Sequence, residues 1–372
     1  MEFSEESRTA NEAKVDASIT YLILAHRSVQ QIHGLIDRLD HPLARFVVHL
    51  DAKQSEDFTS SKQNVFTVTD RVCVEWGRFS MVEATLRCLR LALNLNHPSD
   101  FLILISGQHT PIRPPEELHR YLGRNLGRVF MNYTPIPSPT RWPDQRGGLD
   151  RIEHWYFQIG KRKFGYPLRF WRILFFVTPL IRAAFGNAVA QKIESIASQR
   201  TIPGFRSPWF KRKFPKGWIP YGGSQWWALP REIALRTISE MDQNQKFLKF
   251  FRFTGVPDEL FFQSLILNRV DPTLCINDNL LFEDRTPCTA HAKTLSQEDL
   301  PRCFKSGKFF ARKVDHIEHN EVQTIIDKRI KLQKASQFSG QIDEKFLRSL
   351  PDLNNSAPEH SSATGNRPSS FE

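Results

Sequence analysis

The segment from 221 to 229, which reads YGGSQWWAL, carries side chains suited to holding a sugar. Trp226 and Trp227 are adjacent, and Gln225 stands beside them with a polar amide. Two neighbouring indoles predict a flat aromatic platform, and the amide adds hydrogen-bonding groups. The same two tryptophans also fit a buried strand, in which they would only fill the core.

A second segment, 256–262, supplies acids. Pro257 is favoured in the first turn of a helix, and Asp258 and Glu259 follow it. Because the helix dipole favours negative charge at this end, we expect these carboxylates to be ionised at neutral pH and suited to act as a general base. Acids in a first helical turn are also common without any catalytic role.

Apolar runs alternate with helical patterns in the elements that must position these side chains. Runs of strand type occur at 19–25, 46–50, 65–68, 101–105 and 128–133. Between them, Ser28 is a predicted helix cap, and Ser80 with Glu83 forms a predicted capping box. This alternation predicts an α/β fold with a mostly parallel central sheet and helices on both faces.

Polar residues follow several of the predicted strands. His26, Asp51 and Gly107 each stand at the end of an apolar run. Because ligands of parallel sheets bind beyond the C-terminal ends of strands, we expect these residues around one crevice. The sequence has neither a GxGxxG motif nor a Walker-type phosphate loop, so it supports neither a dinucleotide fold nor a P-loop enzyme. Its five cysteines lack metal-ligand spacing and indicate neither a zinc site nor a disulfide framework.

Positive charge is concentrated in one part of the chain. Of 51 Lys and Arg, 14 lie between 151 and 216, where only two acids oppose them, and the remainder of the chain is close to neutral. The same segment is rich in aromatic residues. Two interpretations stay open: the segment lies against an anionic membrane, or it forms an ordinary helical subdomain over an acceptor groove.

Taken in order, these residues resemble the core-2/I-branching glycosyltransferase family, which also includes the protein xylosyltransferases. The matching pieces are YLILAH at 21–26, VHLDAK at 48–53, WG at 76–77 with Ser80, LISGQ at 104–108 with PI at 111–112, GSQWW at 223–227, PDE at 257–259 and FARK at 310–313. Each piece is weak alone, but seven in the family's order are specific. They span most of the chain, from 21 to 315.

The resemblance implies a GT-A-like nucleotide-diphospho-sugar transferase fold that works without a metal or other cofactor. Glu259 would be the base of an inverting transfer, taking the proton of the acceptor hydroxyl. Asp51 would contact the nucleoside of the donor, with His26 near it. Lys313 matches a position at which a basic side chain replaces the metal at the leaving diphosphate, and Arg312 stands beside it.

Two departures from the family pattern bear on the site. Relatives usually carry Asp where this chain has His109, and an Arg-Tyr pair where it has Leu281-Phe282. The first departure bears on sugar or acceptor preference or on relaxed activity, and the second removes a phosphate cation that Arg285 is the candidate to replace. The predicted substrate contacts are Gln225, Trp226, Trp227, Asp258 and His109.

The resulting organisation has five parts. They are a polar N-terminal tail (1–18), a nucleotide-sugar-binding half (19–134), a basic aromatic insert facing the acceptor or a membrane (135–216), a catalytic half (217–335) and a disordered tail (336–372). The N-terminus lacks the pattern of a signal peptide, and the apolar stretch 168–185 is broken by Arg and Pro. We therefore expect a bacterial-type member in the cytoplasm or at the inner face of the membrane.

The expected reaction moves N-acetylglucosamine or xylose from a UDP-sugar to a hydroxyl of a glycan, a lipid-linked saccharide or a protein. Glucose and galactose are alternative donor sugars. The alternative from another class is a degenerate transferase that acts as a basic binding protein for nucleic acid or an acidic polymer. Because the basic segment has no nucleic-acid-binding motif, we expect no specific nucleic acid partner.

Overall fold

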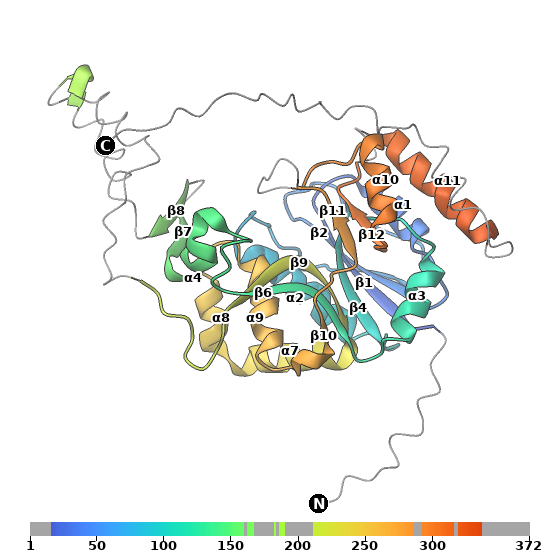
Figure 1. Cartoon of the computed structure of the whole chain (residues 1–372), viewed down its shortest axis with the longest axis horizontal. Coiled ribbons are helices and arrows are strands. Elements are labelled where there is room, and N and C mark those ends of the chain that lie inside the picture. The colour runs from blue at the N-terminus through green and yellow to red at the C-terminus, as the bar shows by residue number, and fades with distance from the viewer. Residues whose placement is uncertain are drawn as a thin grey trace, which may run out of the picture.

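The computed structural model describes residues 16–159, 162–166, 182–183, 186–189, 211–285, 292–315 and 319–336. Its centre is a seven-stranded sheet in the order β10-β6-β9-β4-β1-β2-β3 (Figure 1). The strands are β1 (Ile19–Ala25), β2 (Ala44–Leu50), β3 (Val65–Thr67), β4 (Phe101–Ser106), β6 (Val129–Pro135), β9 (Tyr221–Pro230) and β10 (Cys275–Ile276). All five apolar runs that predict strands therefore form strands of this sheet.

Strands β1 to β4 are parallel, and β9 runs antiparallel between β4 and β6. The predicted α/β fold with a mostly parallel sheet is thus confirmed. Strand β9 comes from the predicted catalytic half, 217–335, yet it pairs on both sides with strands of the first half. The two predicted halves therefore share one sheet.

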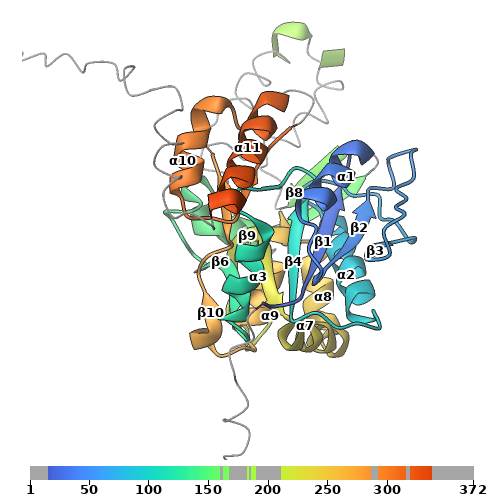
Figure 2. The same cartoon turned by 90° about the vertical axis from the view of Figure 1, so that its right-hand side faces the viewer.

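Helices cover both faces of this sheet (Figures 1 and 2). Helices α2 (Ser80–Leu93), α7 (Arg231–Gln243) and α9 (Phe261–Leu267) lie on one face, and α1 (Val29–Arg38) and α3 (Pro115–Gly123) lie on the other. A smaller sheet, β11-β12-β5, packs on this second face, where Phe310 meets the ring of Tyr21 edge-on at 6.4 Å. The remaining elements are β5 (Thr110–Pro111), β7 (Trp155–Ile159), β8 (Arg162–Tyr166), β11 (Leu281–Glu283), β12 (Phe310–Arg312), α4 (Leu149–Glu153), α8 (Gln245–Phe251), α10 (Leu300–Lys305) and α11 (Asn320–Ser336), with 3-10 turns at Pro143–Gly148, Pro257–Glu259, Pro272–Leu274 and Gln297–Asp299.

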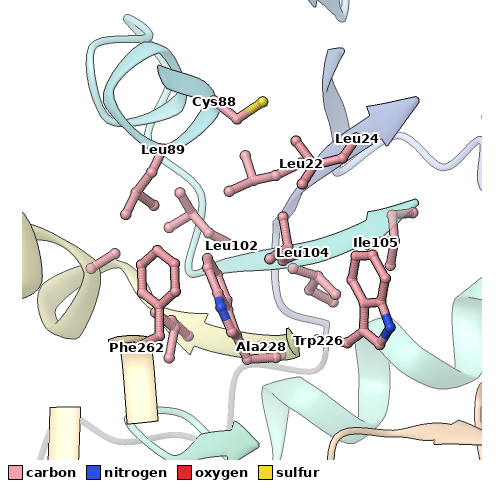
Figure 3. Close-up of a cluster of buried hydrophobic side chains, with 14 of the residues drawn as sticks. Leu22, Leu24, Cys88, Leu89, Leu102, Leu104, Ile105, Trp226, Ala228 and Phe262 are labelled. Atoms are coloured by element: carbon pink, nitrogen blue, oxygen red, sulfur yellow. The ribbon is translucent and has the colours of Figure 1, made fainter. Parts of the chain in front are cut away.

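The core lies on both sides of the sheet because both of its faces are covered. Leu22 and Leu24 of β1 point toward Leu89 of α2 (Figure 3). Tyr21, one residue earlier, points to the opposite face and stacks on Phe46 with 5.4 Å between the ring centroids. Successive side chains of a strand alternate between faces, so a strand covered on both sides is buried throughout, as β1 is.

One of the two predicted helix caps is confirmed and the other is wrong. The Ser28 hydroxyl accepts a hydrogen bond from the backbone N–H of Gln31 at 3.1 Å, as a capping residue should. The capping box of Ser80 and Glu83 does not form, because Ser80 is already the first residue of α2. Its hydroxyl accepts instead from the backbone N–H of Glu75, at 2.8 Å, in the preceding turn.

Some of the predicted organisation falls outside the described residues. This holds for the N-terminal tail up to residue 15 and for the C-terminal tail from residue 337. Within the basic insert, only 135–159, 162–166, 182–183, 186–189 and 211–216 are described, so its contact with a membrane or an acceptor stays a prediction. Of the helices in the described part of the chain, none combines the length and apolarity needed to cross a membrane.

Candidate active site

An open pocket lies where the central sheet, the small sheet and the 257–259 turn meet. The space between its walls, open solvent at its mouth included, is about 460 Å³, and groups from five separate parts of the chain line it. The lining residues are Trp76, Ser224, Gln225, Trp226, Val256, Asp258, Glu259, Arg285, Ala292, Arg312 and Lys313. Seven of the predicted site residues therefore converge on one cavity. They are Gln225, Trp226, Asp258, Glu259, Arg285, Arg312 and Lys313.

The two tryptophans of β9 do not form the predicted platform. Trp227 is buried in the core, where its ring lies 5.3 Å from that of Phe262 in α9. Trp226 points to the opposite face and lines the pocket. The prediction of two side-by-side rings is wrong because adjacent residues of a strand face opposite sides of the sheet.

The two glycines of the same strand are required by close neighbours. A Cβ at Gly223 would lie 1.7 Å from the carbonyl oxygen of Asn132, beside the irregularity in the pairing of β6 with β9. A Cβ at Gly222 would lie 2.4 Å from the ring of Trp142 and 3.3 Å from the carbonyl oxygen of Glu259. Gly222 thus gives Trp142 room to pack beside the acidic turn.

The acidic residues occupy a short 3-10 turn, Pro257–Glu259, rather than the first turn of an α-helix, because α9 begins only at Phe261. The predicted ionisation of both acids is wrong for Asp258, which is 8% exposed. Burial, followed by the neighbouring charge of Glu259, raises the pKa of Asp258 to about 7. Its Oδ1 is buried without a hydrogen-bond partner among the described residues.

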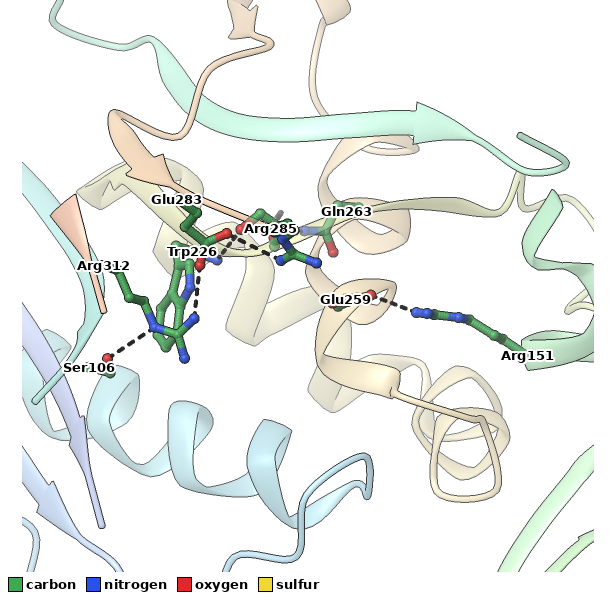
Figure 4. Close-up of polar contacts among 9 residues, drawn as sticks. Ser106, Arg151, Trp226, Glu259, Gln263, Glu283, Arg285 and Arg312 are labelled. Atoms are coloured by element: carbon green, nitrogen blue, oxygen red, sulfur yellow. Dashed lines mark hydrogen bonds and ion pairs between the residues drawn. The ribbon is translucent and has the colours of Figure 1, made fainter. Parts of the chain in front are cut away.

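Glu259 meets a different environment. Its Oε2 accepts a hydrogen bond from Nη1 of Arg151 at 2.6 Å, and the two side chains also form an ion pair (Figure 4). Within the part of the chain that the structure describes, Oε1 of Glu259 has no hydrogen-bond partner. The carboxylate therefore has one oxygen held and one available to the pocket.

A cation that is only partly exposed lies on another wall of the pocket. Arg312, at the end of β12, forms an ion pair with Glu283 at 2.8 Å, and its guanidinium carbon lies 4.9 Å from the ring centre of Trp226 (Figure 4). Its Nε also donates to the Ser106 hydroxyl at 3.4 Å. Burial would raise the pKa of Glu283, but the charges and hydrogen bonds of Arg312 and Arg285 together lower it, so the carboxylate stays ionised.

Positive charge exceeds negative charge along this wall. Arg285 contacts the same Glu283 at 3.2 Å, which places two guanidinium groups on one carboxylate. Lys313 has no ion pair or side-chain hydrogen bond to any described residue. Desolvation, then the charge of Arg312, lowers the pKa of Lys313. The wall is therefore short of anions, and an anionic ligand would relieve the repulsion.

A network of backbone contacts positions this wall against the strand ends. Gln31 of α1 is buried and donates from Nε2 to the carbonyl of Gly107 at 2.8 Å and to that of Val314 at 2.9 Å. The N–H of Val314 donates in turn to the carbonyl of Gln108 at 3.0 Å. Lys313 is thus held beside the end of β4, although it lies more than 200 residues later in the chain.

His109 lies behind the pocket rather than in its lining. It is buried, and its ring meets that of Trp226 edge-on at 4.7 Å. Its Nδ1 accepts from the backbone N–H of Ser106 at 3.0 Å, which places the ring proton on Nε2. Burial, then the charge of Arg312, holds the pKa of His109 well below its ordinary value, so the ring is neutral. His109 therefore packs against Trp226 and does not itself line the pocket.

His26 and Asp51 also lie outside the pocket lining, at neighbouring strand ends. The parallel register pairs Ala25 with Leu50, which brings these two strand ends together, and their predicted place around a ligand crevice stays a prediction. Asp51 is buried and accepts from the backbone N–H groups of Lys53, at 2.9 Å, and Val74, at 3.3 Å. Desolvation, then the charge of Arg27, lowers the pKa of His26. No group of three or more His, Cys, Asp or Glu side chains is placed to hold a metal ion in the residues that the structure describes.

Among the residues of the site that have no counterpart among the predicted ones, Trp76 and Arg151 stand out by their contacts. Trp76 is 51% exposed at the lip of the pocket, and the N–H of Val256 donates to the carbonyl of Gly77 beside it. Its Trp-Gly motif forms part of the family resemblance but carries no predicted role. Arg151 holds Glu259, and its sequence context gives no such signal because it begins a run of basic residues typical of a solvated surface.

Comparison with known proteins adds independent findings. Residues 19–153 match the family model described as Core-2/I-Branching enzyme. Xylosyltransferase oxt of Drosophila melanogaster is 26% identical over 73% of this chain and 27% of its own length. Xylosyltransferase 2 of Homo sapiens is 22% identical over 83% of this chain and 33% of its own, and xylosyltransferase sqv-6 of Caenorhabditis elegans is 22% identical over 91% and 41%. The chain thus spans about a third of the length of the first two of these relatives.

Proposed function

The chain belongs to the Core-2/I-branching enzyme family, and from this premise we propose that it is an inverting glycosyltransferase that uses a UDP-sugar. The single observation that carries the proposal is the convergence of Glu259, Asp258 and three basic side chains on one pocket. Sugar transfer from a diphosphate requires a base for the acceptor hydroxyl and positive charge for the leaving phosphates. In this pocket the carboxylate of Glu259 suits the first task, and the three basic side chains suit the second.

In the proposed reaction, Oε1 of Glu259 accepts the proton of an acceptor hydroxyl as that oxygen attacks the anomeric carbon. The bond between the anomeric carbon and the diphosphate oxygen breaks, and its electron pair leaves with the diphosphate. Attack from the face opposite to the leaving group inverts the configuration. Glu259 ends the step protonated and returns its proton to solvent.

The leaving diphosphate gains charge as the bond breaks. Arg312, Lys313 and Arg285 line the pocket, and among the described residues Glu283 is the acid that pairs with both Arg312 and Arg285. We propose that Lys313, whose side chain has no hydrogen-bond or ion-pair partner among the described residues, contacts the phosphates directly, while Arg312 is fixed by Glu283 and Trp226. Cations that are already in place stabilise developing negative charge without reorganisation. This is the proposed basis for transfer without a metal ion.

The proposed sugar contacts come from β9 and the acidic turn. Gln225 Nε2 and Asp258 Oδ1 are buried without partners in the described part of the structure, and both residues line the pocket. Because buried polar groups are normally satisfied, a ligand with hydroxyl groups suits these two atoms. Trp226 offers the aromatic face for the ring of the sugar, and Trp76 at the lip suits an acceptor sugar or peptide. We propose xylose or N-acetylglucosamine as the transferred sugar.

A binding and turnover screen tests this proposal. The purified chain is incubated with UDP-xylose, UDP-N-acetylglucosamine, UDP-glucose and UDP-galactose, each with and without EDTA, and thermal stability and UDP release are measured. We expect one donor to raise the melting temperature and to release UDP slowly with EDTA present. Activity that EDTA abolishes would refute the metal-independent step. No binding of any nucleotide sugar, together with tight binding of nucleic acid or an acidic polymer, would identify a degenerate transferase instead.

A further inference from the structure

The contact between Arg151 and Glu259 joins two parts of the chain that lie 108 residues apart. Arg151 lies in the short helix α4 (Leu149–Glu153), and Glu259 ends the acidic turn. Their side chains are 10% and 16% exposed, so the 2.6 Å contact is well shielded from water. Shielding strengthens an ion pair, and the guanidinium fixes the direction of the carboxylate.

Other groups hold Arg151 itself in place. Its Nε donates to the side-chain oxygen of Gln145 at 2.6 Å, and its guanidinium carbon lies 4.7 Å from the ring centre of Trp142. The backbone carbonyl of Arg151 accepts from the N–H of Gly255, just before the acidic turn, at 3.0 Å. Arg151 is therefore tied to the acidic turn through both its side chain and its backbone.

We propose that Arg151 is the positioning residue for the base of the transfer reaction. It binds Oε2 of Glu259 and thereby turns Oε1 toward the pocket, where the acceptor hydroxyl must arrive. This inference rests on the proposed function, because it assigns Arg151 a task only if Glu259 removes a proton. In this role Arg151 touches neither donor nor acceptor.

A lysine cannot perform this task fully. The planar guanidinium donates from Nε to Gln145 and from Nη1 to Glu259 at once, in a fixed geometry. The single ammonium of a lysine lacks this fork and lies on a more flexible stem. We therefore expect Arg151→Lys to keep the charge but to hold the carboxylate less firmly.

The neighbouring Arg146 provides a matched control. Its Nη1 contacts Glu153 at 2.6 Å and Asp150 at 3.1 Å, and neither acid lines the pocket. Arg146→Ala removes an arginine ion pair from the same segment without touching Glu259. A general loss of structure in this segment would affect both variants, whereas a loss of positioning affects only Arg151→Ala.

The test is a double-mutant cycle in the full chain, measured with the donor found in the screen. In Arg151→Ala we expect kcat to fall about 10- to 100-fold at unchanged donor KM, the scale of a misplaced catalytic group. Added guanidinium ion at millimolar concentration should recover part of the activity, and Arg151→Lys should lie between. In a Glu259→Gln background, Arg151→Ala should change the residual turnover less than twofold.

Each outcome separates the two proposals. If wild-type enzyme transfers sugar but Arg151→Ala keeps its kcat, or lowers turnover by the same factor in the Glu259→Gln background, the positioning role is overturned and the transferase function stands. If Arg151→Ala fails to fold, Arg151→Lys decides the same cycle. If the wild-type chain binds and transfers no nucleotide sugar, the proposed function falls and this inference falls with it.

Discussion

Glu259 and Asp258 are neighbours in the chain, yet their carboxyl groups meet different surroundings. Glu259 pairs with a cation, whereas Asp258 is buried with Oδ1 unpartnered in the described part of the molecule. Pairing favours the ionised form and burial favours the protonated form. Because its pKa is raised to about 7, Asp258 is close to half protonated at neutral pH. Such a division gives a base and a hydrogen-bond donor on adjacent residues.

The role of Glu259 predicts a selective loss of turnover. Glu259→Gln keeps the size of the side chain and the contact with Arg151 but cannot accept a proton. We expect kcat to fall about 10²- to 10⁴-fold, the contribution of general base catalysis, with donor affinity unchanged. Single-turnover kinetics and donor titration measure the two quantities separately. Unchanged turnover in the variant would remove Glu259 from the mechanism.

The raised pKa of Asp258 predicts a pH-dependent stability. Asp has a pKa of 3.8 when unperturbed and about 7 here, so between these values the folded chain holds a proton that the unfolded chain has released. The free energy of unfolding therefore falls as pH rises from about 4 to about 7. Asp258→Asn cannot ionise, so we expect it to be more stable than the wild type at pH 8, by up to about 4 kcal/mol, and equal to it near pH 4.

Denaturant unfolding of both proteins across this pH range measures the effect. A difference between the two proteins that stays constant from pH 4 to pH 8 would contradict the raised pKa. Loss of a hydrogen bond alone would give such a constant difference, because it does not depend on ionisation of the carboxyl group.

At the scale of elements, β9 separates a structural residue from a functional one. Trp227 packs on α9 inside the core, and Trp226 faces the pocket between His109 and Arg312. We expect Trp227→Ala to lower the free energy of unfolding by about 3–5 kcal/mol, the usual cost of such a cavity. Trp226→Phe keeps most of the ring, so it should cost less than about 1.5 kcal/mol and weaken donor or acceptor binding instead. Chemical denaturation and donor titration of both variants test the assignment, which equal stability losses would refute.

The same strand shows what the sequence could and could not reveal. The identity of β9 as a strand follows from its pattern, and the period of two already implies that Trp226 and Trp227 face opposite sides. The predicted platform is wrong because residues that are adjacent in a strand do not lie on the same face of the sheet. By contrast, no period or spacing relates Arg151 to Glu259, since their contact exists only once β9, α4 and the acidic turn are packed together. Local patterns predict elements, and long-range contacts between insert and core do not follow from them.

At the scale of the whole molecule, two kinds of positive charge serve different ends. Lys313, Arg312 and Arg285 line one pocket, and two of them share the carboxylate of Glu283, whereas much of the remaining excess charge lies in the basic segment 151–216. Charges inside a pocket are screened less by salt than charges on an open surface. Salt dependence therefore distinguishes a site for a nucleotide from a surface that attracts any polyanion.

This difference predicts two salt responses in one protein. Between 50 and 200 mM salt, we expect affinity for UDP to fall less than about tenfold, because few partly buried cations hold it. Affinity for a duplex oligonucleotide, if carried by six or more surface cations, should fall about 10³-fold or more.

Lys313→Met should weaken UDP binding and leave oligonucleotide binding unchanged, because one lysine of the pocket contributes little to a broad surface. Isothermal titration of both ligands with both proteins measures this, and a Lys313→Met chain that binds UDP like the wild type would show that Lys313 does not contact the phosphates.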